Sequence, residues 1–148
     1  MKRIFHILII LTVLSIIPIY GNAQCKSFAK KVCKLELTPY IHDGNYNAAI
    51  LTEGEDAELY KTFYADQNYR IYICGSDALP DIEFQVLDVN RNVLYDNRKN
   101  DYERIWDFKL QASQQLIISL RVKNSEDETD ELVSGCVAIM FGIKEDKN

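Results

Sequence analysis

Eight short segments rich in Ile, Val, Phe and Tyr constrain the fold of this chain more than any other feature of its sequence. Turn-forming residues such as Gly, Asn, Asp and Pro separate the earlier segments, and no helical pattern falls between them. The segments lie at residues 48–51, 58–64, 69–74, 82–88, 93–97, 105–110, 115–122 and 136–143. Short strands at this spacing are typical of antiparallel sheets packed face to face. The sequence therefore predicts an all-β fold, an antiparallel jelly-roll-like β-sandwich of about eight strands over about residues 48–143.

The last segment, 136–143, is apolar at almost every position, which is typical of a central strand covered on both faces. In a jelly roll the third and eighth strands are antiparallel neighbours, so segment 69–74 is expected beside it. Because side chains alternate along a strand, Ile71 would then face the core. Cys74 and Cys136 would share the opposite face, which needs a cover of its own.

A short amphipathic helix is predicted over about residues 25–37, before Pro39. Phe28, Val32 and Cys33 recur at helical intervals, and lysines occupy most of the other positions. We expect this apolar stripe to pack on the outer face of the sheet that contains the last segment.

The amino terminus predicts an export signal over residues 1–23. It begins with two basic residues, continues with an apolar run too short to span a bilayer, and ends with small side chains at Gly21 and Ala23. Cleavage is therefore predicted before Gln24. A single domain, 24–148, would remain, located in the periplasm, at the cell surface or outside the cell, with no membrane insertion after signal cleavage.

The four cysteines, Cys25, Cys33, Cys74 and Cys136, all follow the predicted cleavage site. An even number of cysteines in an exported protein indicates disulfides. Cys25 and Cys33 lie about 12 Å apart along one regular helix and cannot join there. We favour a bond between Cys74 and Cys136. For Cys25 and Cys33, either the helix is interrupted between them, or both side chains reach the face of the sheet. Lipidation of Cys25 stays open, although the bulky Gln24 before it argues against a lipoprotein site.

Composition and motifs argue against several classes of function. The chain has a net charge of −5, so nucleic acid and anionic lipid surfaces would repel it, and we predict no nucleic-acid binding. The sequence has no GxSxG motif, and His42, the single histidine after the predicted signal, lies among turn-forming residues where we expect it at the surface. We therefore predict an exported non-catalytic binding or structural module. The alternative is a small exported enzyme or enzyme inhibitor with a site in its loops.

Aromatic residues offer one candidate binding surface. Tyr60, Thr62 and Tyr64 fall on one face of their segment, opposite Leu59 and Phe63, so one of these two faces should be exposed. Exposed tyrosines can hold a protein, peptide or glycan partner. Most tyrosines of a sandwich, however, simply lie between its core and its rim.

A second candidate is a calcium loop that begins with Asp88, Asn90 and Asn92 at alternate positions. An EF-hand loop then requires Gly at its sixth position and Glu at its twelfth, where this chain has Val93 and Lys99. The other interpretation is a hairpin turn in which Asn and Asp form local hydrogen bonds. No other cofactor is predicted.

The order of these features resembles the bacterial pre-peptidase C-terminal domain family and its jelly-roll relatives. The matching stretches are "LTEGEDAELYKTFYADQNYRIYIC", "IEFQVLDVNRNVLYDN" and "QQLIISLRV", and the resemblance covers about residues 50–143. The amino-terminal helix and the four cysteines depart from the family's pattern. The resemblance implies an accessory or binding module rather than a catalyst.

Overall fold

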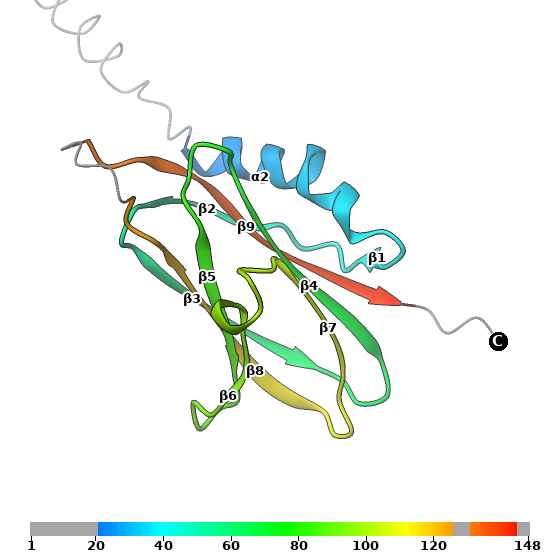
Figure 1. Ribbon diagram of the computed structural model, residues 1–148. Coiled ribbons are helices and arrows are strands. Elements are labelled where there is room, and N and C mark those ends of the chain that lie inside the picture. The colour runs from blue at the N-terminus through cyan, green and yellow to red at the C-terminus, as the bar shows by residue number, and fades with distance from the viewer. Residues whose placement is uncertain (1–20, 126–130, 145–148) are drawn as a thin grey trace, which may run out of the picture.

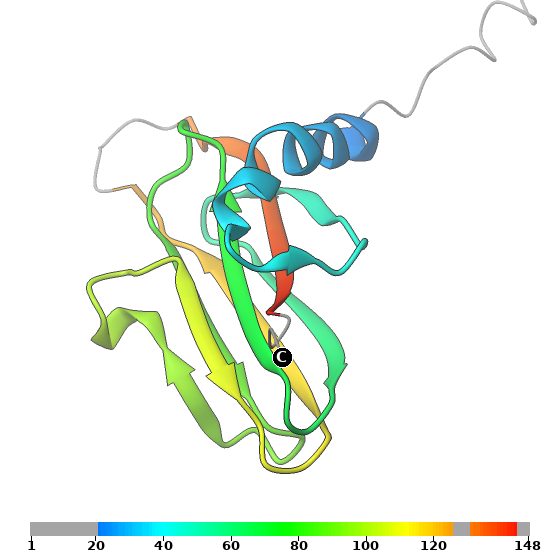
Figure 2. The same ribbon diagram turned by 90° about the vertical axis from the view of Figure 1, so that its right-hand side faces the viewer.

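The structure, a computed structural model, describes residues 21–125 and 131–144. Two antiparallel β-sheets pack face to face, and helix α2 (Gly21–Lys31) lies across the outside of one of them (Figures 1 and 2). A 3₁₀ helix, η1 (Cys33–Leu37), follows α2 directly. The predicted all-β sandwich with a short amino-terminal helix on one sheet is confirmed. The predicted export signal lies almost entirely outside the described residues, and cleavage before Gln24 stays a prediction.

Nine strands form the two sheets, and their order is that of a jelly roll. The strands are β1 (Ile41–His42), β2 (Asn47–Thr52), β3 (Asp56–Phe63), β4 (Asn68–Gly75), β5 (Ile82–Leu87), β6 (Val93–Asp96), β7 (Ile105–Lys109), β8 (Gln114–Val122) and β9 (Ser134–Lys144). One sheet has the order β1-β9-β4-β7, with β2 also paired to β9, and the other has the order β3-β8-β5-β6. All eight predicted segments form strands. The additional strand, β1, is only two residues long.

Strand β9 lies at the centre of its sheet, as predicted. It pairs antiparallel with β4 on one side, where Ile71 is opposite Phe141 and Cys74 is opposite Ala138. Both β1 and β2 pair with it on the other side. Ile71 and Phe141 are fully buried in the core between the sheets.

The outer face of this sheet is buried under the helix. A second apolar cluster forms there from Ala29, Cys33, Leu37, Cys74, Ala138 and Met140. Buried helix positions recur every four residues, at Cys25, Ala29 and Cys33, which places them on one face. The prediction that Val32 faces the sheet is wrong. It lies at the break between α2 and η1, and its side chain is exposed.

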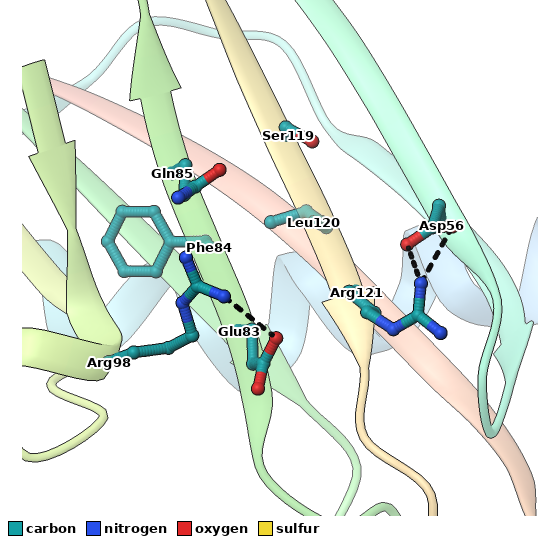
Figure 3. A pocket seen from close by; sticks show the side chains of 8 residues that line it. All are labelled: Asp56, Glu83, Phe84, Gln85, Arg98, Ser119, Leu120 and Arg121. Atoms are coloured by element: carbon teal, nitrogen blue, oxygen red, sulfur yellow. Dashed lines mark hydrogen bonds and ion pairs between the residues drawn. The ribbon is translucent and has the colours of Figure 1, made fainter. Parts of the chain in front are cut away.

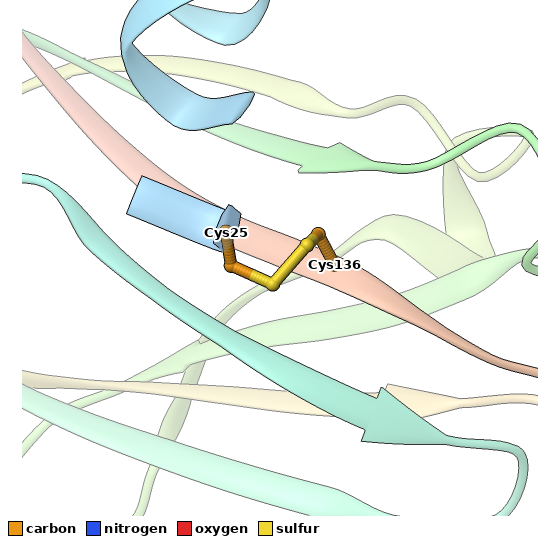
Figure 4. The surroundings of a disulfide bond; sticks show 2 residues. All are labelled: Cys25 and Cys136. Carbon is orange, nitrogen blue, oxygen red and sulfur yellow. A yellow bond between two sulfur atoms is a disulfide. The ribbon is translucent and has the colours of Figure 1, made fainter. Parts of the chain in front are cut away.

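Two disulfides join this helical segment to the sheet, and the predicted bond between Cys74 and Cys136 is wrong. Cys25 is bonded to Cys136 (Figure 4), and Cys33 is bonded to Cys74. The sheet register explains the difference, because Cys74 is opposite Ala138 and therefore two residues away from alignment with Cys136. Each strand cysteine meets a cysteine of the helical segment above it. The sulfur of Cys25 is thus not available to carry a lipid, and no cysteine thiolate remains for zinc.

Replacing each disulfide by a pair of serines tests this connectivity. We expect Cys25→Ser with Cys136→Ser, and Cys33→Ser with Cys74→Ser, each to lower the free energy of unfolding by about 2–5 kcal/mol. The first pair closes a separation of 111 residues and the second one of 41. The chain-entropy model therefore predicts about 0.9 kcal/mol more loss for the first pair. Urea denaturation measures both values. A peptide linking Cys74 to Cys136 in non-reducing mass mapping would contradict the assignment.

Candidate functional site

The outer face of the four-stranded sheet faces solvent and carries the candidate site. Strand β3 directs Asp56, Glu58, Tyr60 and Thr62 outward, and all four are exposed. Tyr64, which follows the strand, is exposed as well. The sequence predicted that either this face of the strand or the opposite one is exposed. The face that carries Tyr60, Thr62 and Tyr64 is the exposed one. Its role in binding a ligand stays a prediction.

An apolar row crosses this outward face from one edge of the sheet to the other. The strand register aligns Tyr60 with Ile117, Ile117 with Leu87, and Leu87 with Val93. The two outer members of the row, Tyr60 and Val93, are 54% and 52% exposed, whereas Ile117 and Leu87 are 3% and 5% exposed. The row thus has a covered middle and two accessible ends.

Arg91 connects the two candidate sites predicted from the sequence. It belongs to the turn between β5 and β6, and its guanidinium forms an ion pair with the carboxylate of Glu58 on β3. The hydroxyl of Tyr60 donates a hydrogen bond of 3.3 Å to the same carboxylate. Strand β8 lies between β5 and β3, and neighbouring strands are about 4.8 Å apart, so the Arg91 side chain reaches across β8. The hydrogen bond from Arg91 lowers the pKa of Glu58.

The turn that carries Arg91 is held by local hydrogen bonds. The carboxylate of Asp88 accepts bonds from the backbone N–H of Asn90 (2.8 Å), and from the backbone N–H and Nδ2 of Asn92 (2.9 and 2.8 Å). These bonds lower the pKa of Asp88. Arg91 adopts a left-handed φ of 65°, and Val89 is exposed at the tip. The geometry is that of a hydrogen-bonded hairpin turn, and the calcium hypothesis for Asp88, Asn90 and Asn92 stays a prediction.

A polar hollow of about 140 Å³ lies on the same face beside the apolar row (Figure 3). Its polar lining comes from Asp56, Glu83, Gln85, Arg98, Ser119 and Arg121. Arg121 donates to both oxygens of Asp56 (3.1 and 3.2 Å), and Arg98 lies 4.0 Å from the carboxylate of Glu83. Guanidinium and carboxylate groups therefore alternate across the sheet. No local sequence pattern brings these residues together, because their proximity depends on strand pairing.

Arg98 lies on the 3₁₀ helix η2 (Asn97–Lys99), which two buried polar residues hold against the sheet. The buried side chain of Asn97 accepts a hydrogen bond from the backbone N–H of Phe84 (2.8 Å) and donates one to the carbonyl of Ile82 (2.9 Å). The almost buried carboxylate of Asp96 accepts bonds from Arg98 Nε (2.9 Å) and Nη2 (2.7 Å). The Arg98 guanidinium holds the pKa of Asp96 well below its ordinary range.

His42 has a structural environment, and the prediction of a surface turn histidine is wrong. It lies in β1, its side chain is almost buried, and its ring packs at 4.5 Å from the ring of Tyr46. The ring nitrogen Nε2 lies 3.0 Å from the carbonyl of Asn45. The neighbouring Asp43 accepts a hydrogen bond of 2.7 Å from Lys61 on β3, which connects the edges of the two sheets. This cluster therefore closes one side of the sandwich.

Comparison with known proteins shows similarity to a solved structure. No family model matches the chain, and no curated protein matches its sequence. The fold is similar to the crystal structure of Aeromonas hydrophila PliG, a periplasmic lysozyme inhibitor of g-type lysozyme. The two structures have a TM-score of 0.50 and 14% sequence identity, over 72% of this chain and 89% of that chain. At this identity the similarity concerns the fold alone. The resemblance to the pre-peptidase C-terminal domain family stays a prediction.

The disulfides fit a protein that is exported from the reducing cytosol. Within residues 21–125 and 131–144, no helix is long and apolar enough to cross a membrane. In the same part of the chain, no group of three or more His, Cys, Asp or Glu side chains is arranged to hold a metal ion.

Asp96→Asn tests the polar support beneath Arg98. A carboxylate whose pKa is lowered by folding contributes stability above its unfolded pKa of about 3.9, and the contribution is lost as the pH falls through the lower folded value. We expect the variant to lose about 1–2 kcal/mol of unfolding free energy at pH 7. The difference from the parent protein should narrow below about pH 4. Denaturant unfolding between pH 3 and pH 7 measures the free energy of unfolding of both proteins. A difference between them that does not depend on pH would contradict the role of the Asp96 charge.

The hairpin interpretation of residues 88–92 has its own test. We expect Asp88→Ala to lower the melting temperature, because the turn loses the acceptor of three hydrogen bonds. Chelator should leave the melting temperature of the parent protein unchanged. If calcium instead raises the melting temperature of the parent protein and not that of Asp88→Ala, the result would support the calcium hypothesis.

Proposed function

We propose that this chain is an exported, non-catalytic module that inhibits a lysozyme by binding it through the outer face of the four-stranded sheet. The observation that carries the proposal is the combination of Tyr60, Arg91 and Arg121 on one solvent-exposed face. Tyrosine and arginine are enriched among the residues that dominate the energy of protein–protein interfaces. By analogy with PliG, the proposed location is the periplasm.

The face is ordered before any partner arrives, which lowers the entropic cost of binding. Arg91 is held by Glu58, and Arg98 is held by Asp96. The hydrogen bonds of Asp88 fix the hairpin that presents Val89 and Val93, both of which are exposed. A partner therefore meets a rigid surface with an apolar row at its centre and polar groups around it.

Two points support a lysozyme as the partner. PliG has a similar fold and is an inhibitor of g-type lysozyme. In addition, most glycoside hydrolases use a pair of carboxyl groups at the scissile bond, and a guanidinium binds a carboxylate through two parallel hydrogen bonds. The side chains of Arg98 and Arg121 are about half exposed, so part of each guanidinium is accessible to such a carboxylate.

A glycan-binding accessory module is the second candidate, and the resemblance to the pre-peptidase C-terminal domain family supports it. The specific observation in its favour is that Tyr60 and Tyr64 are both exposed on one face. Exposed aromatic rings can stack on sugar rings. In this case the partner would be a polysaccharide, and Arg121 would contribute little.

Inhibition assays with lysozymes of the g-type and of other classes test the proposal. We expect the parent protein to inhibit at least one class, and Tyr60→Ala and Arg121→Ala each to weaken inhibition by about tenfold or more. Arg121 pairs with the exposed Asp56, so its removal costs little stability. The matched control is Arg104→Ala, which removes an exposed arginine before β7 of the other sheet.

Binding to isolated peptidoglycan separates the two candidates. Retention on peptidoglycan that Tyr60→Ala abolishes, with no inhibition of any lysozyme, would favour the glycan-binding module. If Arg104→Ala weakens inhibition as much as Arg121→Ala does, the proposed face is the wrong one.

A further inference from the structure

We propose that the outward face of α2 and η1 is a second interaction surface, which docks the protein on an anionic phospholipid bilayer. The surface consists of Lys26, Lys30, Lys31 and Lys34 together with Val32 and Leu35. It lies on the opposite side of the molecule from the proposed inhibitory face, because α2 covers the outside of the other sheet (Figures 1 and 2).

Positive charge is concentrated on this helical segment. All four lysines are exposed, and Glu36 is the one acidic residue between Gly21 and Leu37. Arg70, Arg91, Arg98, Arg121 and Lys61 each form an ion pair with a carboxylate. Among the described residues, none of the four helix lysines has such a partner. No described carboxylate therefore pairs with these lysines, and with Glu36 counted the segment keeps an excess of positive charge.

The carboxylates on the outer face of the four-stranded sheet lie far from this local charge. Packed sheets lie about 10 Å apart, and α2 lies beyond the outer face of its sheet. The outward carboxylates of Asp56 and Glu83 are thus separated from the helix by more than the Debye length of about 10 Å at 0.1 M salt. The expectation that anionic lipid surfaces repel the chain, drawn from its net charge, takes no account of this separation.

The positions of the lysines go beyond what helix stability requires. Lys30 and Lys31 lie in the last turn of α2, where positive charge interacts favourably with the helix dipole. Lys26 lies in the middle of the helix, away from the last turn, where it gains nothing from the dipole. The disulfides of Cys25 and Cys33 fix the opposite face of the segment on the sheet, so the lysines are held outward together.

Two exposed apolar side chains favour a bilayer over a soluble polyanion. Val32 and Leu35 are 52% and 70% exposed, and the backbone N–H of Leu35 donates to the carbonyl of Val32 (3.3 Å), so the two lie in one turn. Lys31 directly precedes Val32 in the sequence, and Lys34 directly precedes Leu35. Basic and apolar side chains together on a helical surface are typical of segments that lie at a membrane interface.

Flotation with vesicles tests the proposal. We expect the parent protein to bind vesicles that contain phosphatidylglycerol, not to bind vesicles of phosphatidylcholine alone, and to dissociate as salt is raised. Lys26→Gln with Lys30→Gln should lower the partition coefficient about 25-fold, since each lysine near an anionic surface contributes about fivefold. The matched control, Lys99→Gln with Lys109→Gln, removes two exposed lysines elsewhere and should change it little.

Leu35→Ser distinguishes a bilayer from a soluble polyanion. We expect this variant to lose vesicle binding and to retain any binding to heparin. The proposal is overturned if the parent protein does not float with phosphatidylglycerol vesicles at low salt. It is also overturned if the control pair loses as much binding as the helix pair, or if Leu35→Ser binds vesicles as the parent does. Lysozyme inhibition by Lys26→Gln with Lys30→Gln should stay unchanged, which separates this surface from the proposed inhibitory face.

Discussion

The two disulfides between the amino-terminal helical segment and strands β4 and β9 hold the layered structure together. Strand β9 directs Ala138 and Met140 away from the core, and both are fully buried only because α2 and η1 cover them. Burying apolar surface contributes about 25 cal/mol for each Å² removed from water. Because Cys25 and Cys33 are both bonded to the sheet, the cover is fixed at two points along its length.

The two outward faces of the sandwich differ as a consequence. One is apolar and buried under the helix, whereas the other carries alternating guanidinium and carboxylate groups around a partly covered apolar row. On the second face, Arg91 reaches from the turn after β5 to Glu58 on β3, so one side chain connects two strands that are not neighbours. The same layered arrangement places the lysines of α2 on the far side from Arg98 and Arg121. Two surfaces of different chemistry are therefore available to different partners.

The strands were predictable because alternation and turn residues are local properties. The core position of Ile71, the pairing of β4 with β9 and the buried outer face of β9 all followed from the sequence pattern. The cysteine pairing did not follow, because alternation assigns a residue to a face and not to a partner on that face. The break after α2 likewise exposes Val32, although its helical spacing places it with the buried residues.

The sequence by itself determined the β-sandwich, the helix that accompanies it, the even set of cysteines and the shared face of Tyr60, Thr62 and Tyr64. These depend on periodicity and composition within short windows. Only the tertiary structure decided that Arg91 reaches Glu58, that Arg98 and Arg121 line one hollow, and that Cys25 joins Cys136. Such groups come from strands and turns far apart along the chain. Their proximity depends on strand order and register, which no local pattern encodes.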